Sequence, residues 1–173
     1  MRKGQTGVFD LIVAVIIAII ALFALAISWD RFVIKLNDKN EYNDLQMKLF
    51  QISDLLISSE GTPTEWNLAG DLDSETTSLG IAYHDRCISE EKLNLVKDPS
   101  NFDEIKVKLH IETFNLYIAF NKLDDLETPE TTIGSTPVSS DQKIISLQRY
   151  AMMDCNNEGT RGEPYQITFK LWR

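Results

Sequence analysis

The feature that most constrains what this chain can fold into is an uninterrupted apolar run near its start. Residues 11–29 are 19 consecutive residues without a charge. As an α-helix they would extend about 28 Å, close to the roughly 30 Å hydrocarbon thickness of a bilayer. The alternative is a buried core helix, but a helix that is apolar on every face needs more surrounding protein than a body of this size offers. We therefore predict a membrane-spanning helix.

The remainder of the 173-residue chain is acidic. From residue 30 onward it holds 25 of the 26 acids and 15 of the 17 bases, a net charge of −10. The hydrophobic content of 43% is enough for a packed core. Because an acidic surface repels phosphate backbones, we expect no nucleic acid partner. The chain should therefore have two parts, an apolar stem and an acidic soluble body.

The residues in front of the apolar run differ from those of a simple anchor. Arg2, Lys3 and Gly4 precede Gln5, and Asp10 lies at the margin of the run. A carboxylate in a membrane helix costs a few kcal/mol unless it is paired. Cleavage after Gly4 would create a positive amine on Gln5, and on neighbouring copies of the chain. Asp10 would then have a counter-ion in an assembly that it lacks as a single helix.

A cleavable secretory signal is an alternative explanation of this start, because it also combines bases with an apolar segment. Against it, the apolar run is long, and Asp30 and Arg31 follow directly. Ala24 and Ala26 could imitate its cleavage site, although no clear small-residue site is present.

Residues 2–29 resemble archaeal type IV pilin-like proteins, whose class III signal peptides have a short basic leader, a cut before a Gln and a hydrophobic helix after the cut. In this family the acid is commonly at mature position five, which in this chain is Phe9, and Asp10 is at position six. The resemblance implies processing between Gly4 and Gln5 by a prepilin peptidase. It also implies pilus assembly machinery and other copies of the chain, or other pilin-like subunits, as partners.

Small residues line part of the apolar run. Ala14, Ala18, Ala21 and Ser28 fall near one face, with Ala24 beside them. Small residues let helices approach closely in lipid, so this face is a candidate packing surface for assembly. The alternative is that Ala is simply common in membrane helices.

The helix is expected to continue beyond the membrane. Apolar residues at steps of three and four from Tyr42 to Leu56 indicate an amphipathic helix, so one helix should run from about Phe9 to Ser58. Gly61 and Pro63 then end it. We predict a leader (1–4), a hydrophobic helix (5–29), its amphipathic continuation (30–60) and a globular head (61–173).

The head is predicted to be α+β. Trp66 should cover the helix, Ser89 should cap a short helix, and another helix should start at Asn101. Alternation over 113–121 predicts a half-buried strand, 122–141 reads as a long polar loop, and 142–153 and 165–172 predict two more strands. The expected arrangement is an antiparallel β-meander packed on the long helix.

Catalytic chemistry has little support in the sequence. His84 beside Asp85 is typical of a solvated turn, and His110 lies between two apolar residues. The acids at 71, 73 and 75 suggest a calcium loop, but Thr76 and Ala82 occupy positions where an EF-hand needs Gly and Glu. We expect no enzymatic activity, no cofactor and no metal.

The two cysteines, Cys87 and Cys155, are the whole thiol inventory. In an exported head they could form one disulfide, which would stabilise the fold by about 4 kcal/mol. The alternative is a pair of buried free thiols.

Together these features favour a structural subunit, a major or minor pilin of a type IV pilus-like filament, held in the membrane as a precursor and displayed at the cell surface after assembly. The alternative is an uncleaved single-pass protein whose extracellular head binds a partner. A membrane-anchored hydrolase lacks a convincing nucleophile and base.

Overall fold

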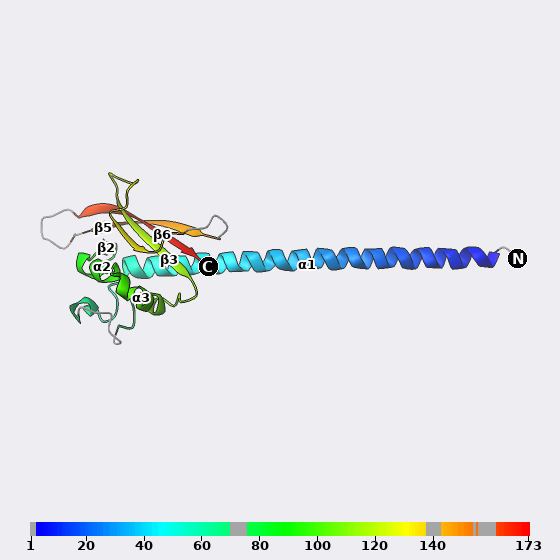
Figure 1. Cartoon of the computed structure of the whole chain (residues 1–173), viewed down its shortest axis with the longest axis horizontal. Coiled ribbons are helices and arrows are strands. Elements are labelled where there is room, and N and C mark those ends of the chain that lie inside the picture. The colour runs from blue at the N-terminus through cyan, green and yellow to red at the C-terminus, as the bar shows by residue number, and fades with distance from the viewer. Residues whose placement is uncertain (1–2, 70–75, 138–142, 154, 156–161) are drawn as a thin grey trace. The chain divides into compact units, whose positions relative to one another are not determined.

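The computed structural model of the chain describes residues 3–69, 76–137, 143–153, 155 and 162–173. It contains two compact units, residues 1–43 and 44–173. Helix α1 (Lys3–Ser58) supplies the described part of the first unit and continues into the second (Figure 1).

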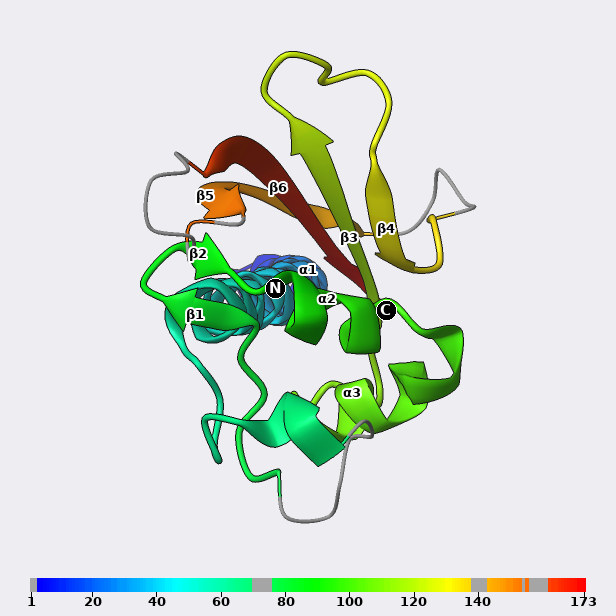
Figure 2. The same cartoon turned by 90° about the vertical axis from the view of Figure 1, so that its left-hand side faces the viewer.

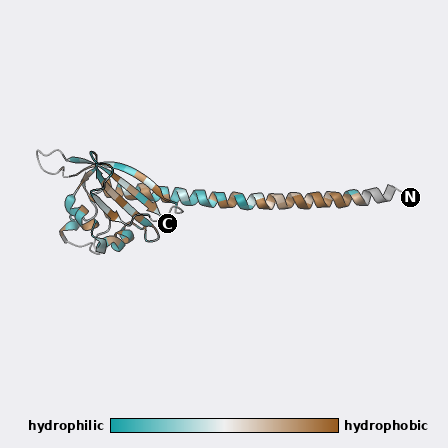
Figure 3. Ribbon diagram, turned by 45° about the horizontal axis from the view of Figure 1, so that its top comes forward, coloured by the Kyte–Doolittle hydropathy of each residue, from teal (hydrophilic) through white to brown (hydrophobic). Residues whose placement is uncertain are grey.

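The N-terminal part of α1 is an apolar helix without a covering layer. Every residue from 9 to 40 is exposed, including the aliphatic and aromatic side chains up to Leu36. Figure 3 shows hydrophobic residues giving way to hydrophilic ones along α1. Within the described residues one helix, Phe9–Ser58, is long and apolar enough to cross a membrane. The predicted continuous helix is confirmed, and the polar residues 37–40 do not interrupt it.

In the part of the second unit that the structure describes, the strands form one six-stranded sheet with the order β1-β2-β5-β6-β3-β4. Its strands pair antiparallel except β2 and β5, which are parallel. The strand bounds are β1 (Ala82–His84), β2 (Cys87–Ile88), β3 (Asn115–Lys122), β4 (Thr131–Gly134), β5 (Ile145–Met153) and β6 (Glu163–Trp172). The α+β class is therefore confirmed. Strands β1 and β2 were not predicted, because runs of three and two residues are too short to show an alternating pattern.

The predicted meander is wrong. Strand β6 lies between β3 and β5, so that Phe169 is opposite Ile118 on one side and Leu147 on the other. The physical reason lies in the apolar pattern of β6, whose inward residues are all buried and benefit from pairing on both edges. These residues are Tyr165, Ile167, Phe169 and Leu171.

The predicted polar loop, 122–141, contains a strand. Residues Thr131–Gly134 form β4 and pair with β3, where Ile133 is opposite Ile118. Only Ile133 of this strand is buried, which leaves too weak an alternation for sequence reasoning to detect. Residues 138–141 lie outside the described part of the chain.

Strand β3 was predicted to be half-buried, but it is buried on both faces. Leu116, Ile118 and Phe120 contribute to the main core, as their alternation predicts. On the opposite face, Tyr117 and Ala119 form a smaller buried cluster with Trp172. Trp172 of the neighbouring strand β6 covers this opposite face of β3. The alternation within β3 alone does not reveal that contact.

The core of the second unit joins α1 to the sheet. Leu45, Leu49, Ile52 and Leu56, at the predicted helical spacing, are almost fully buried, and each stabilises the fold by about 1.5–3 kcal/mol. Figure 2 shows the sheet over one side of α1 and helices α2 (Glu90–Val96) and α3 (Phe102–Lys108) on another. Short 3₁₀ turns occupy Trp66–Ala69 and Pro99–Asn101.

The predicted caps and covers of the head are present. The Ser89 side chain accepts a hydrogen bond from the Lys92 amide at the start of α2. Trp66 is 2% exposed and its indole N–H donates to the Gly80 carbonyl at 3.1 Å. Gly61, with φ +83°, lies three residues after the last residue of α1, and its amide donates to the Ser59 hydroxyl at 3.0 Å.

Candidate membrane and assembly segment

Asp10 is the only acid between residues 9 and 29 and is exposed on α1. Within the described residues it forms no ion pair, since the three salt bridges present all lie between residues 60 and 163. A bare carboxylate on an otherwise apolar helix disfavours burial in lipid, and a nearby cation would remove this penalty. Asp10 therefore marks the position on the helix where an external partner has the largest energetic effect.

The small residues of α1 share a face with that carboxylate. At about 100° per residue, Asp10, Ala14, Ala18 and Ala21 fall within roughly 40° of one line along the helix, and Ser28 lies on its continuation. All are exposed. The Ser28 hydroxyl donates to the Ala24 carbonyl at 2.8 Å, so it does not present an unsatisfied donor. The sequence predicted the small-residue face, and its alignment with Asp10 follows from the continuous helix.

The predicted processing site lies in the first turns of α1, which begins at Lys3 and includes the backbone of Gly4 and Gln5. Arg2 lies outside the described residues. At the other end of the apolar segment, the Trp29 and Phe32 rings contact each other with centroids 6.2 Å apart, and Arg31 and Lys35 are exposed around them. Aromatic and basic side chains of this kind are typical of a membrane–water boundary.

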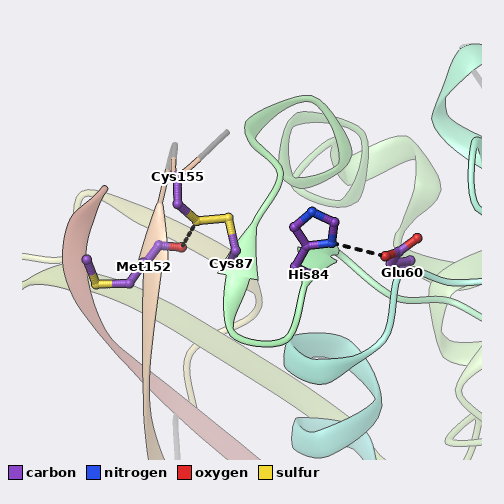
Figure 4. Close-up of a disulfide and its surroundings, with 5 residues drawn as sticks. All are labelled: Glu60, His84, Cys87, Met152 and Cys155. Carbon is purple, nitrogen blue, oxygen red and sulfur yellow. Dashed lines mark hydrogen bonds and ion pairs between the residues drawn. A yellow bond between two sulfur atoms is a disulfide. The ribbon is translucent and has the colours of Figure 1, made fainter. Parts of the chain in front are cut away.

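The head brings Cys87 and Cys155 together. They form a disulfide with Cα atoms 6.0 Å apart, across a sequence separation of 68 residues (Figure 4). Cys87 lies in β2, opposite Met152 of β5, so the parallel pairing of these strands places the bridge. The bridge fastens the small outer strands β1 and β2 to the main sheet.

His84 is paired but exposed. Its Nδ1 lies 3.4 Å from Glu60 Oε1 (Figure 4), and 72% of the His84 side chain is exposed. The Tyr83 ring packs edge-on against the imidazole, with ring centroids 4.7 Å apart. These residues border a hollow of about 570 Å³, whose described lining also includes Ser89, Cys87 and Cys155. The two cysteines are bridged, and the Ser89 hydroxyl accepts from the Lys92 amide. His110, with φ +55°, is exposed after the end of α3.

The described part of the chain contains no arrangement of side chains suited to a metal ion. There, no group of three or more His, Cys, Asp or Glu side chains is arranged to hold a metal ion. The calcium-like acids at 71, 73 and 75 lie outside the described residues.

Two polar clusters in the head were not predicted. Lys92 is 4% exposed, and burial lowers its pKa although the charge of Glu60 opposes the shift. On the sheet, Lys122 contacts Glu163 at 2.8 Å, while the Tyr165 hydroxyl donates to Glu130. The hydrogen bond to Glu163 raises the pKa of Lys122. Such clusters depend on strand pairing, which no local pattern reveals.

No family model, curated protein or solved structure matches the chain. The fold and the exposed apolar segment define an α+β protein with a long N-terminal helix that is compatible with membrane anchoring. Any more specific function is inferred from the residues of this chain alone.

Proposed function

We propose that this chain is a structural subunit of a type IV pilus-like surface filament, held in the membrane as a precursor and assembled through its N-terminal helix. The carrying observation is the exposure of every residue from 9 to 40 on α1, with a single carboxylate on its small-residue face. An apolar helix of this length requires lipid or other apolar helices around it. Both surroundings are used in turn by a subunit that moves from membrane to filament.

Asp10 makes the transfer of the helix from membrane to filament energetically favourable. In the membrane its charge opposes burial, whereas in a filament the amine created on Gln5 of an adjacent copy neutralises it. Ala14, Ala18 and Ala21 allow adjacent helices to approach closely next to this pair. The prepilin peptidase, which frees the amine, and the assembly machinery are the partners that this function implies. The head is then displayed outward, and no step requires an enzyme activity or a cofactor.

The decisive experiment uses native protein from cells. We expect the mature N-terminus to be Gln5 and the protein to sediment as filaments after shearing from the surface. An Asp10→Asn variant should still be processed but should fail to enter filaments, and an Asp30→Asn variant, which removes an acid outside the apolar run, is the matched control. Retention of Met1, together with detergent-soluble monomers only, would instead identify a single-pass anchored protein.

A further inference from the structure

We propose that the head binds a small oxyanion, a carboxylate, sulfate or phosphate group, between the C-terminal part of α1 and strand β5. A cavity of about 190 Å³ lies there. Its lining includes two arginines, Arg86 and Arg149, and the hydroxyl-bearing residues Ser53, Ser58 and Tyr150. Guanidinium groups and hydroxyls are the side chains that bind oxyanions most directly. A pair of arginines around a cavity contrasts with the net charge of −9 on the whole chain.

Arg149 is held in place by contacts that leave the end of its side chain available. Its Nε donates to the Ser53 hydroxyl at 3.3 Å, and its Cζ lies 5.3 Å from the centroid of the Phe50 ring. Ser53 is itself fully buried and donates to the Phe50 carbonyl at 2.9 Å. Among the described residues, the two terminal NH₂ groups of Arg149 form no hydrogen bond or ion pair. These groups can together grip two oxygens of one ligand.

Arg86 provides an independent observation. Its φ is +60°, in the left-handed region that Gly adopts without strain and that a side chain with Cβ adopts at a cost. Both of its backbone polar groups are fixed, because its amide donates to Ile57 at 3.1 Å and its carbonyl accepts from Met152 at 2.8 Å. The turn therefore requires the backbone conformation but not an arginine. Because Arg86 also lines the cavity, we infer that its guanidinium binds the oxyanion.

Among the described residues, neither arginine of the cavity is neutralised by an ion pair. One acid of the described lining, Asp54, borders the cavity, but it forms no ion pair with Arg86 or Arg149 there. The competing explanation is that the arginines only complement the negative C-terminal end of α1. That explanation accounts for positive charge but not for the fixed orientation of Arg149. An oxyanion would occupy the position that a carboxylate partner would otherwise take.

The test uses the full-length, isotopically labelled chain in an uncharged detergent. Sodium sulfate and sodium glucuronate are titrated at constant ionic strength against sodium chloride, with neutral glucose as the control for the sugar ring. We expect a saturable shift of the Arg149 Nε–Hε signal, with a dissociation constant on the order of 1 mM. Stronger binding of glucuronate than of sulfate would identify an acidic sugar as the ligand source, and equal binding an inorganic anion.

Variants separate binding from stability. Arg149→Gln should weaken binding at least about tenfold, the loss of one charge-assisted interaction. Lys97→Gln, which removes the same charge from an exposed position after α2, should leave binding unchanged. Arg86→Gly relieves the left-handed strain, so it should keep the melting temperature while losing the oxyanion. The proposal is overturned if no saturable shift occurs, if Lys97→Gln weakens binding as much as Arg149→Gln, or if Arg86→Gly binds normally.

Discussion

The Nζ of Lys92 donates a 2.6 Å hydrogen bond to the carbonyl of Glu60, two residues after the end of α1. The same ammonium donates to the carbonyl of Ala82, the first residue of β1, at 3.3 Å. One buried lysine of α2 thereby satisfies backbone acceptors from two other segments. Because an orphaned buried acceptor costs about 1–3 kcal/mol, this side chain fixes the junction between the long helix and the head.

Substitution of Lys92 by Met should lower the free energy of unfolding by about 1–3 kcal/mol, since similar volume is kept but both carbonyls lose their donor. Burial lowers the pKa of Lys92, so the unfolded chain binds its proton more tightly than the folded chain does. The contribution of Lys92 to the free energy of unfolding therefore rises as the pH increases toward the ordinary lysine pKa of about 10.4.

Denaturant unfolding of the full chain in detergent, at pH 7 and at pH 9.5, measures both effects. The stability difference between wild type and Lys92→Met should be larger at the higher pH. Lys97→Met, at an exposed position in the same region, serves as the control and should show neither effect. A difference that shrinks as the pH rises would contradict the assignment.

The disulfide should contribute on the order of 4 kcal/mol, because it closes a long loop in the unfolded chain. Replacing Cys87 and Cys155 by Ser should lower the denaturation midpoint, and reducing the wild-type protein should give nearly the same midpoint. Thiol labelling of the unfolded protein, with and without reductant, reports the bridge directly. Full labelling without reductant would show that the two thiols are free in the native protein.

Trp66 should be sensitive even to a conservative change. Replacement by Phe keeps most of the apolar contact but leaves the Gly80 carbonyl without its indole donor, at a cost of about 1–3 kcal/mol. Replacement by Ala also creates a cavity and should cost about 3–5 kcal/mol. Thermal unfolding followed by circular dichroism separates the two variants. Equal stability of wild type and Trp66→Phe would show that the hydrogen bond has no net effect.

The parts of the fold that local patterns encode were predictable. The helix to Ser58, the cap at Ser89 and the start of a second short helix near Asn101 all follow from spacing, capping and turn chemistry within a few residues. The position of β6 between β3 and β5 was not predictable, because the pairing of β3 with β6 joins residues more than forty positions apart.

Of the candidate sites, too, only those that depend on local sequence spacing were predictable. Asp10 and the small-residue face were visible in the sequence because helical periodicity alone aligns them. By contrast, Arg86 and Arg149 are 63 positions apart and meet only because the turn after β1 contacts the end of α1 and a strand of the sheet. Sequence spacing carries no signal for such a pair. The one local hint, an arginine with positive φ, exists only in the structure.

Tyr165 should make the head sensitive to alkali. Burial and the hydrogen bond to Glu130 raise its pKa to about 12, above the ordinary value of about 10. The folded chain thus keeps the phenolic proton that the unfolded chain loses, so stability falls as the pH rises from about 10 to 12, by about 2–3 kcal/mol in total. Tyr165→Phe should remove this part of the slope. An unchanged slope in the variant would assign the alkaline loss to other groups, such as Lys122.

The small-residue face of α1 gives a sterically defined prediction for assembly. Ala18→Phe places a bulky ring on the line that Asp10, Ala14 and Ala21 share, whereas Ile16→Phe places the same ring roughly on the opposite side of the helix. Close helix approach depends on small side chains, so Ala18→Phe should reduce filament yield much more than Ile16→Phe. Membrane insertion should be equal, because both variants keep an apolar segment of the same length. Quantitative blotting of sheared filaments against the membrane fraction measures the ratio, and equal losses in the two variants would remove the assembly role of this face.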